Sequence, residues 1–445
     1  MSPRTTLPPG PTGTFLGGNI RQFTAHRLDF FLDSARQYGD LVSFRFGPRR
    51  AFLASHPDLV ERVLVTDAKH YVKHFGARMY KPVLGNGLVT SEGDFWLRQR
   101  RLSQPAFLKS RVQSYAPQMA DLTDRMLADW ADGMSVDVHF EFSRLTSAIA
   151  LKTLFGLDDP GDRERFTETL RAAFDVMSAR FRQVLRAPDW VPTPSNRRLK
   201  RAVAELNRVV DGFIAAGRAR PQAGDDLLSR LLAARDVDGA RMTDRQLRDE
   251  AMTLYLAGHE TTALTLTWSW YLLARHPKVE EALVAEWQAV LGGRTPAPED
   301  LTRLPYTDAV IAEAMRVFPP VYLIGREATS DQELGGYRVK RGDTVFMSQW
   351  VSHRDPRYFD DPEEFRPERW LDGLAGRIPK YAYYPFGGGP RVCIGNTFAL
   401  MEATILLAAV GQKYRFTLSS DRPAEFNPQI TLLPKDGIPA ILRQR

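Results

Sequence analysis

The chain has 445 residues, of which 43% are hydrophobic, 11% aromatic and 25% charged, the composition of an ordinary globular protein. Its single cysteine excludes an intramolecular disulfide framework, a zinc site of four thiolates and a cysteine-ligated iron-sulfur cluster. The chain carries 60 basic and 53 acidic residues, a formal net charge of +7. Because the two signs are interspersed along the chain, we expect no nucleic-acid partner.

No fixed-period repeat and no glycine- and serine-rich linker divides the sequence, so residues 1–445 are expected to form one domain with residues 1–20 as an extended leader. The leader holds neither the apolar run of a secretory signal nor that of a membrane anchor. The most apolar long stretch, residues 251–274, contains His259 and Glu260, which favours a helix buried in a globular core over a membrane span.

Local patterns first predict two short strands within residues 40–65, around a turn at Gly47, and then a mostly helical region. Short strands are expected again within residues 321–348, followed by an irregular connection over residues 350–392 and a strand-rich tail. In this pattern helical periodicity dominates from about residue 95 to 318, and the expected strands are short. The expected helices are residues 113–131, 139–157, 162–186, 198–218, 251–274, 278–291, 306–317 and 396–412.

The only cysteine, Cys393, lies in the stretch "PFGGGPRVCIG", residues 385–395. The three consecutive glycines allow backbone angles and close approaches that side chains would forbid. The helix that is expected after Gly395, together with Arg391, favours the thiolate over the thiol, and the thiolate is the form that binds a metal. A lone free cysteine is more often a small buried hydrophobic residue, so the loop by itself leaves both interpretations open.

A second polar motif, "AGHETT" at residues 257–262, interrupts the long apolar helix. An acid and a hydroxyl inside such a helix are costly to bury unless they are paired or hydrated. Gly258 in mid-helix would allow a local bulge or kink there. Hydroxyls that bond back to carbonyls of their own helix are the simpler alternative.

The sequence "EAMR" places Glu313 and Arg316 three residues apart, on one face of a helix. Such a pair is usually exposed and contributes about 0.3 kcal/mol. Here apolar residues flank it on both sides, which makes an exposed pair less expected.

The spacing of Phe386, Gly389, Arg391, Cys393 and Gly395 is that of the haem-ligand signature of cytochromes P450, and the sequence resembles this family along nearly its whole length. The resemblance implies a mainly α fold with a small β lobe, a triangular prism that holds haem b between the central helix and the cysteine loop. It also implies that Cys393 is the metal ligand, a thiolate that donates electron density to the iron.

The same resemblance assigns roles to further residues. Glu260 and Thr261 would be the acid and the alcohol of a proton-delivery pair. Glu313, Arg316 and Arg369 would form a buried triad that fixes the loop over the cysteine, and Trp370 after Arg369 replaces a more usual phenylalanine, a change expected to matter little. The expected haem contacts are Trp96, Arg100, Arg326, Phe386, Gly387, Arg391, Cys393 and Gly395, the arginines and Trp96 serving the propionates. The expected substrate pocket consists of Met79, Tyr80, Val83, Leu84, Phe174, Met177, Phe181, Ala257, Val321, Tyr322, Ile324, Ile430 and Leu432, with Thr261 beside them.

The resemblance implies a monooxygenase that inserts one atom of O2 into a lipophilic substrate, such as a terpenoid, a steroid or a fatty acid. The sequence contains no dinucleotide-binding fingerprint and no flavin or iron-sulfur module, so electrons from NAD(P)H are expected to arrive through a separate ferredoxin or flavodoxin. Residues 97–111 hold five basic residues and no acidic one, and are the expected docking site for this acidic partner, a solvated helix face being the alternative.

We further expect a monomer in the bacterial cytoplasm, without a membrane anchor. Two other functions stay open at this point. A peroxide-driven haem peroxygenase would use the same thiolate without a reductase, although that branch usually lacks an acid-alcohol pair. A non-catalytic haem sensor or carrier would bind the cofactor and turn over nothing.

Overall fold

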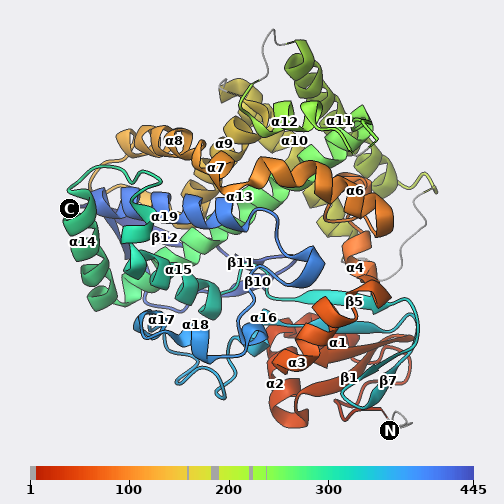
Figure 1. The fold of residues 1–445 in the computed structure, drawn as a ribbon. Helices are drawn as coiled ribbons and strands as arrows, with labels where there is room; N and C mark the ends of the chain where they lie inside the picture. Colours follow the sequence, from red (N-terminus) through yellow and green to blue (C-terminus); the bar gives the residue numbers. More distant parts are fainter. Residues whose placement is uncertain (1–6, 158–159, 182–189, 220–223, 237) are drawn as a thin grey trace. The chain divides into compact units, whose positions relative to one another are not determined.

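In the computed structural model the chain forms two compact units, each assembled from separate stretches of sequence (Figure 1). Helices α8, α9 and α13 each continue from one unit into the other. Unit 1 comprises Met1–His74, Met119–Ser143 and Thr261–Arg445, and unit 2 comprises Phe75–Gln118 and Arg144–Glu260. The structure describes residues 7–157, 160–181, 190–219, 224–236 and 238–445.

Unit 1 contains a five-stranded sheet in the order β1-β2-β8-β5-β3, a three-stranded sheet β4-β12-β9 and two strand pairs, β6-β7 and β10-β11. Strands β1 and β2 form the antiparallel hairpin that the sequence predicts within residues 40–65, and β2 pairs in parallel with the distant β8. The bounds are β1 Leu41–Phe46, β2 Arg49–Ala54, β3 Tyr71–Lys73, β4 Ser135–Asp137, β5 Ile324–Ala328, β6 Gln332–Leu334, β7 Tyr337–Val339, β8 Thr344–Met347, β9 Tyr414–Leu418, β10 Phe426–Pro428, β11 Leu432–Pro434 and β12 Pro439–Gln444.

Both faces of the five-stranded sheet are buried, and alternate residues of β2 serve opposite faces. Leu53 joins a cluster with Phe31 and other residues of α2, whereas Phe52 packs with Tyr381 and Tyr384. Those two tyrosines come directly before the cysteine stretch. The sheet therefore anchors the chain just ahead of Cys393.

The helices of unit 1 lie in two stretches of sequence, one before His74 and a larger one in the C-terminal half of the chain. Helix α19 is buried on all sides from Met401 to Gly411, as expected for a helix that is apolar all round. At Gly411 the packing is so close that an added Cβ would lie 2.1 Å from the ring of Trp287. The bounds are α1 Ile20–Ala25, α2 Arg27–Tyr38, α3 Pro57–Glu61, η1 Arg62–Thr66, η2 Ala68–His70, α14 Pro277–Leu291, η4 Leu301–Arg303, α15 Pro305–Val317, α16 Gln349–Ser352, α17 Glu368–Leu371, α18 Leu374–Arg377, η5 Lys380–Ala382, η6 Gly389–Arg391 and α19 Asn396–Lys413.

The stretch 350–392, predicted to be irregular throughout, contains helical turns: most of α16, and α17, α18, η5 and η6. The prediction was wrong there because helices of three or four residues are too short to show a 3.6-residue period of apolar positions. The expected helices at 278–291, 306–317 and 396–412 correspond to α14, α15 and α19.

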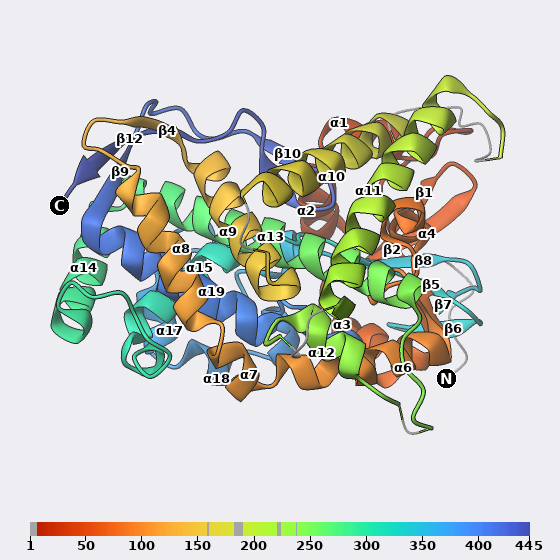
Figure 2. The same cartoon turned by 90° about the horizontal axis from the view of Figure 1, so that it is seen from above.

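In the residues described, unit 2 is built from helices, and α10 and α11 pack against each other (Figure 2). Helix α11 buries Leu199, Leu206, Val210 and Ile214, a spacing that places them on one face. The bounds are α4 Phe75–Arg78, α5 Lys81–Leu84, α6 Gly93–Ser103, η3 Gln104–Phe107, α7 Lys109–Gln113, α10 Pro160–Phe181, α11 Pro194–Ala219 and α12 Leu227–Ala233, and those of the shared helices are α8 Ala116–Ala128, α9 Val138–Phe155 and α13 Asp244–Arg275.

The central helix α13 begins at Asp244, seven residues before the predicted start, because its first two turns are charged and do not show the apolar pattern of the rest. The predicted helix 162–186 corresponds to α10, and its last residues, from 182 on, lie outside the described residues. Among the described helices, none is both long and apolar enough to span a membrane.

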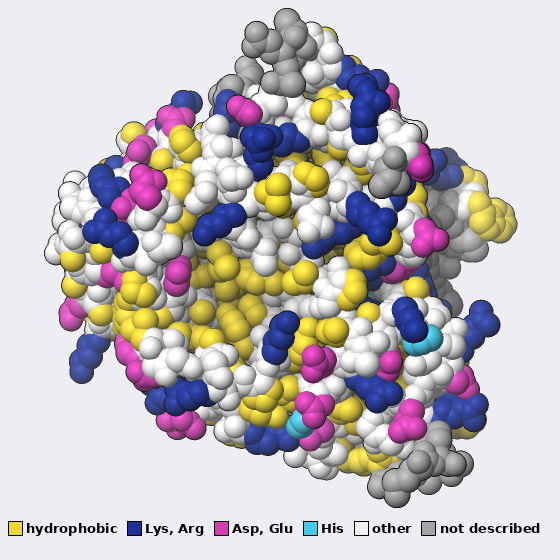
Figure 3. All heavy atoms as spheres, viewed as in Figure 1, with side chains coloured by type: hydrophobic (Ala, Val, Ile, Leu, Met, Phe, Trp, Pro, Cys, Tyr) yellow, Lys and Arg dark blue, Asp and Glu magenta, His cyan; other side chains and the backbone are white. Residues whose placement is uncertain are grey.

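Basic and acidic side chains are mixed over the face of the molecule drawn in Figure 3. Many are joined in exposed pairs, for example Lys435 with Glu425 at 2.6 Å. Such exposed pairs contribute at most about 1 kcal/mol each. These surface pairs therefore contribute little to the free energy of unfolding, and the charged surface mainly affects solubility.

Candidate active site

The cysteine stretch forms a loop of unit 1 that backbone hydrogen bonds close on itself. The N–H of Cys393 donates to the carbonyl of Phe386 at 3.0 Å, and the N–H of Gly387 donates to the carbonyl of Tyr384 at 2.9 Å. Cys393 itself is exposed, and α19 begins three residues later. A lone cysteine that served only as a small core residue would be buried. The loop instead holds the thiol at the surface of unit 1.

Two glycines make this loop possible. Gly387 and Gly389 have φ angles of 72° and 64°, in the region that side chains disfavour. A Cβ on Gly389 would also lie only 1.9 Å from the carbonyl oxygen of Leu64 in η1. The loop thus packs against η1 backbone to backbone, which fixes the direction of Cys393.

Strand β5 lies beside the same loop. The Cδ1 atom of Ile324 is 3.4 Å from the position that a Cβ on Gly387 would take. Arg326 is two residues further along the strand and therefore points to the same face of the sheet as Ile324. The structure accordingly places a partly buried arginine on the sheet face that borders the cysteine loop.

These residues fit a haem. The described part of the chain has no cluster of three or more His, Cys, Asp or Glu side chains that could hold a bare metal ion. A single thiolate is, however, the one protein ligand that a haem iron needs, because the porphyrin supplies four nitrogens. The exposed Cys393, the rigid loop around it and the neighbouring Ile324 and Arg326 match that requirement.

On α13, burial is interrupted at the polar motif. Residues 251–255 and 262–273 are buried, whereas Ala257 is exposed and residues 258–261 are half-buried. The helix itself continues without a break, so the local bulge that Gly258 would allow is not present. The hydroxyl of Thr146 on α9 donates to the carbonyl of His259 at 3.0 Å, and the His259 ring stacks on Tyr255. Glu260 and Thr261 thus belong to a short accessible window on a buried helix.

The ion pair of α15 lies deep inside unit 1. Glu313 and Arg316 are both fully buried, and the guanidinium of Arg316 donates from Nε and Nη2 to the two carboxylate oxygens, each at 2.9 Å. The Nε of Arg369 donates to Oε1 of Glu313 at 3.0 Å. Arg316 also donates to the backbone carbonyls of His353, Pro362 and Glu364. The three side chains therefore tie α15 to the segment that precedes the cysteine loop.

Sequence reasoning missed a fourth member of this cluster. The indole N–H of Trp370 donates to Oε2 of Glu313 at 2.9 Å, and its ring packs on Tyr383 with centroids 4.5 Å apart. Trp370 was expected to be a harmless replacement of phenylalanine. Phenylalanine has no N–H, so the tryptophan adds a hydrogen bond that the more usual residue cannot make.

A second residue that was missed is Glu402, in the apolar middle of α19. The carboxyl is fully buried, and this burial raises the pKa of Glu402 well above its usual range, an effect that the hydroxyl of Thr262 on α13 partly offsets. Burial therefore favours the protonated form of Glu402. A single acid within the apolar run 396–412 was the signal that could have drawn attention to it.

The residues expected to line the substrate pocket belong partly to unit 1 and partly to unit 2. In unit 1, Tyr322 and Leu432 belong to one buried cluster, while Val321 and Ile324 are half-buried and Ile430 is exposed. The hydroxyl of Tyr322 donates to the carbonyl of Gln429 at 2.7 Å, so it is already engaged within the unit.

In unit 2, Val83, Leu84 and Met177 are buried, and Met79 and Tyr80 are half-buried. Trp96 and Arg100, the expected propionate contacts of this unit, lie one turn apart on α6 and are half-buried. The side chains of Phe174 and Phe181 lie outside the part of the chain that the structure describes.

The family model described as cytochrome P450 matches residues 8–440. The chain belongs to the cytochrome P450 family. This confirms the family, the mainly α fold with small sheets and the monooxygenase activity that the sequence predicts. Membership of the family also implies a haem cofactor, O2 as co-substrate, a lipophilic substrate and redox partners.

Two curated P450 relatives come from Streptomyces. Cyclooctatin synthase of Streptomyces melanosporofaciens is 39% identical over 435 residues, covering 96% of this chain and 94% of the relative. Pentalenene oxygenase of Streptomyces avermitilis is 36% identical and covers 88% of this chain and 87% of the relative. Among solved structures, the haem domain of cytochrome P450DA superposes with a TM-score of 0.89 at 28% identity, covering 99% and 98% of the two chains. Retinoic-acid-bound cyanobacterial CYP120A1 gives a TM-score of 0.87 at 26% identity, covering 99% of each chain.

Proposed function

We propose that this P450 hydroxylates a terpenoid and that its cofactor is haem b. The observation that carries the terpenoid proposal is the extended similarity to cyclooctatin synthase and pentalenene oxygenase, which covers most of each chain. The residues expected to line the substrate pocket are mainly apolar, which suits such a substrate because a hydrocarbon skeleton offers few polar groups to bind.

Cys393 is the proposed iron ligand. When bound, the haem supplies the activation of O2, to which the thiolate contributes electron density. The protein's part is to aim the sulfur, which the hydrogen bond from the Cys393 N–H to Phe386 and the packing of Gly389 on η1 both support. Phe386, Gly387, Arg391 and Gly395 of the loop are the proposed haem contacts.

Carboxylates of the haem edge would be held by the side chains of four residues. Arginine guanidiniums and the indole N–H match carboxylates in geometry and charge. Two observations support this proposal. Arg326 lies on the sheet face beside the cysteine loop, and Trp96 and Arg100 lie one helical turn apart on α6. The proposed donors are Trp96, Arg100, Arg326 and Arg391.

Glu260 and Thr261 are the proposed proton-delivery pair. Both lie in the accessible window of α13, where an acid can exchange protons with water and a hydroxyl can pass them on. The buried residues on either side exclude water from the rest of the helix. Thr261→Ala should leave substrate binding intact and reduce the amount of product formed per NADPH consumed.

The proposed electron donor is an acidic ferredoxin or flavodoxin that binds residues 97–111. Arg98 in this segment is paired with Asp236 at 2.7 Å, whereas Arg101, Lys109 and Arg111 are exposed. These three cations and the exposed Leu108 offer a basic surface with an apolar contact, a combination that suits a transient electron-transfer complex. We also propose that the two units act together as one catalytic domain in a monomer. The lone cysteine suits a reducing compartment such as the bacterial cytoplasm.

The thiolate is tested by the spectrum of the reduced protein with carbon monoxide. Wild-type protein should absorb at the position diagnostic of a thiolate ligand, and Cys393→Ser should lose this band while Glu205→Gln keeps it. A histidine-type spectrum in the wild type would contradict the assignment of Cys393.

Substrate class is tested by titrating the oxidised protein with terpene hydrocarbons and alcohols, steroids and fatty acids, while the spin state of the iron is recorded. Terpenoids should give the largest shift and, with NADPH and surrogate redox partners, hydroxylated products. Turnover with peroxide alone that Thr261→Ala leaves unchanged would favour a peroxygenase. Binding without turnover under every condition would favour a sensor or carrier.

A further inference from the structure

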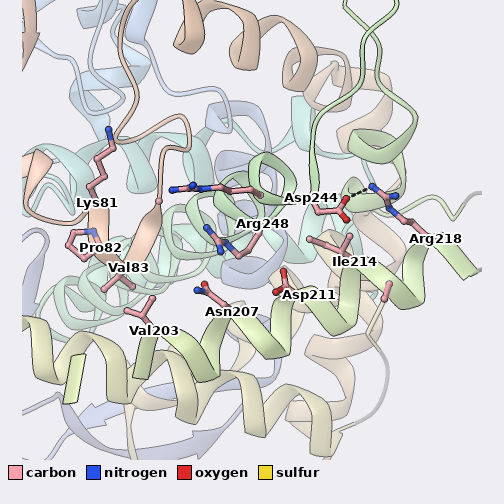
Figure 4. Close-up of a pocket in the computed structure, with 13 residues that line it drawn as sticks. Lys81, Pro82, Val83, Val203, Asn207, Asp211, Ile214, Arg218, Asp244 and Arg248 are labelled. Atoms are coloured by element: carbon pink, nitrogen blue, oxygen red, sulfur yellow. Dashed lines mark hydrogen bonds and ion pairs between the residues drawn. The ribbon is translucent and has the colours of Figure 1, made fainter. Parts of the chain in front are cut away.

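Unit 2 contains a cleft that none of the roles above requires. It has a volume of about 720 Å³ and is formed by α5, α11 and the first turns of α13 (Figure 4). This volume lies in the range of sites that hold small molecules, about 300–1,000 Å³. Only Val83 is shared between its walls and the expected substrate pocket.

Its walls combine cations with apolar side chains. Lys81 on α5 and Arg245 and Arg248 on α13 are the basic groups near the start of the central helix, and Val83 and Val203 provide apolar surface. In the residues that the structure describes, neither Lys81 nor Arg245 is paired with an acid. The amino end of a long helix is itself positive, so Arg245 and Arg248 stand where an anion, rather than a cation, is favoured.

The charges are distributed unevenly along the cleft. In Figure 4 Lys81, Val83 and Val203 lie toward one end, Arg248 lies in the middle, and the acidic side chains of the cleft lie toward the other end. There Asp244 is bound by Arg218, and Asp211 is the acid that stays unpaired among the described residues. An anion would therefore be bound at the Lys81 end and repelled at the other.

Arg248 is held in place before any ligand arrives. Its Nε and Nη2 atoms donate to Oδ1 of Asp249 at 3.1 and 2.6 Å. The other oxygen of that carboxylate accepts the backbone N–H of Asn86 at 2.7 Å. Because these two hydrogen bonds use Nε and Nη2, they leave Nη1 of Arg248 available to a ligand. A fixed donor of this kind lowers the entropy cost of binding.

We propose that this cleft binds the anionic head of an amphipathic molecule, a carboxylate or a phosphate, with its apolar chain against Val83 and Val203. Lys81, Arg245 and Nη1 of Arg248 would bind the head, and the amide of Asn207 on α11 lies on the same wall as Val203. The site is separate from the terpenoid chemistry proposed above and does not depend on it.

The test is isothermal titration of the holoenzyme with decanoate, decyl phosphate and decanol at low ionic strength. The two anions should bind, and decanol should bind at least tenfold more weakly because it lacks the charge. The anion that binds more tightly shows whether the cleft prefers a carboxylate or a phosphate. Addition of 0.5 M salt should weaken anion binding severalfold. The Soret band is recorded in the same titration, because occupation of the haem pocket would shift it and occupation of the cleft should not.

The double variant Lys81→Gln, Arg245→Gln should bind the anions about tenfold more weakly than the wild type, because the loss of each exposed charge should weaken binding roughly threefold. Lys200→Gln combined with Arg201→Gln removes the same charge from exposed positions of α11 outside the cleft and should change binding less than twofold. Equal affinity for decanol and decanoate, or wild-type affinity in the Lys81 and Arg245 variant, would overturn the proposal. The carbon monoxide spectrum checks that every variant is folded.

Discussion

Replacing Glu313 by glutamine should destabilise the protein by about 3–5 kcal/mol, because it leaves buried guanidiniums without their anion. The carboxylate is fully buried and receives hydrogen bonds from Arg316, from Arg369, from the indole of Trp370 and from the backbone N–H of Arg366. Glutamine has nearly the same shape but no charge, and its NH2 group would face donors. The expected loss is a large fraction of the stability of an ordinary domain, about 5–15 kcal/mol.

The assay is urea unfolding of the holoenzyme, followed by far-ultraviolet circular dichroism and by the thiolate band of the reduced carbon monoxide complex. Glu313→Asp keeps the charge with poorer geometry and should lose less, which gives a measurable variant if the glutamine protein does not fold. The matched control is Glu205→Gln on α11, which breaks an exposed pair of the same i,i+3 spacing with Arg208 and should cost less than about 1 kcal/mol. A Glu313→Gln protein as stable as this control would refute the reasoning.

Three further variants test single contacts. Trp370→Phe should cost about 1–2 kcal/mol in urea unfolding, since it removes a hydrogen bond to a charged group and keeps the aromatic ring; no loss would show that the N–H is dispensable. Burial raises the pKa of Glu402 in the folded state, so the unfolded chain releases this proton at a lower pH than the folded protein does. The free energy of unfolding of the wild type should therefore fall as pH rises above about 4.5. The fall should be up to about 1.4 kcal/mol per pH unit, until the pKa of the folded state is reached. Glu402→Gln should lack this slope in unfolding curves between pH 5 and 8, and an unchanged slope would contradict the buried acid. Gly389→Ala adds backbone strain of about 1–2 kcal/mol and a clash with Leu64, and should abolish the thiolate band of the carbon monoxide complex; a normal spectrum would show that the loop tolerates a side chain.

Predictions from sequence succeeded where the feature is determined by residues that are close together in the chain. The fixed spacing around Cys393 and the long apolar helix both led to the family, and the pattern of residues 40–65 predicted a hairpin that the structure contains. They failed where a role depends on partners far away in the chain. Trp370 donates to a carboxylate 57 residues before it, and no local pattern indicates that bond.

The start of α13 shows a different limit. An apolar period locates a helix by its buried face, so the charged turns that begin at Asp244 were left out of the prediction. Those turns carry Arg245 and Arg248, which line the cleft of unit 2. A method that finds helices through their buried face will therefore overlook sites that are built at a polar helix end.

The residues with proposed chemical roles are the more accessible positions on, or next to, elements that are otherwise buried. Cys393 is exposed just before α19, which is buried on all sides from Met401 on, and the window around Glu260 and Thr261 interrupts a helix that is buried before and after it. The buried neighbours hold such positions rigid, while exposure keeps them accessible to a cofactor or to water. Sequence shows which residue types stand there, but exposure is set by packing partners that come from distant parts of the chain. Motifs could thus name Cys393 and the acid-alcohol pair, and only the fold could show that they are accessible.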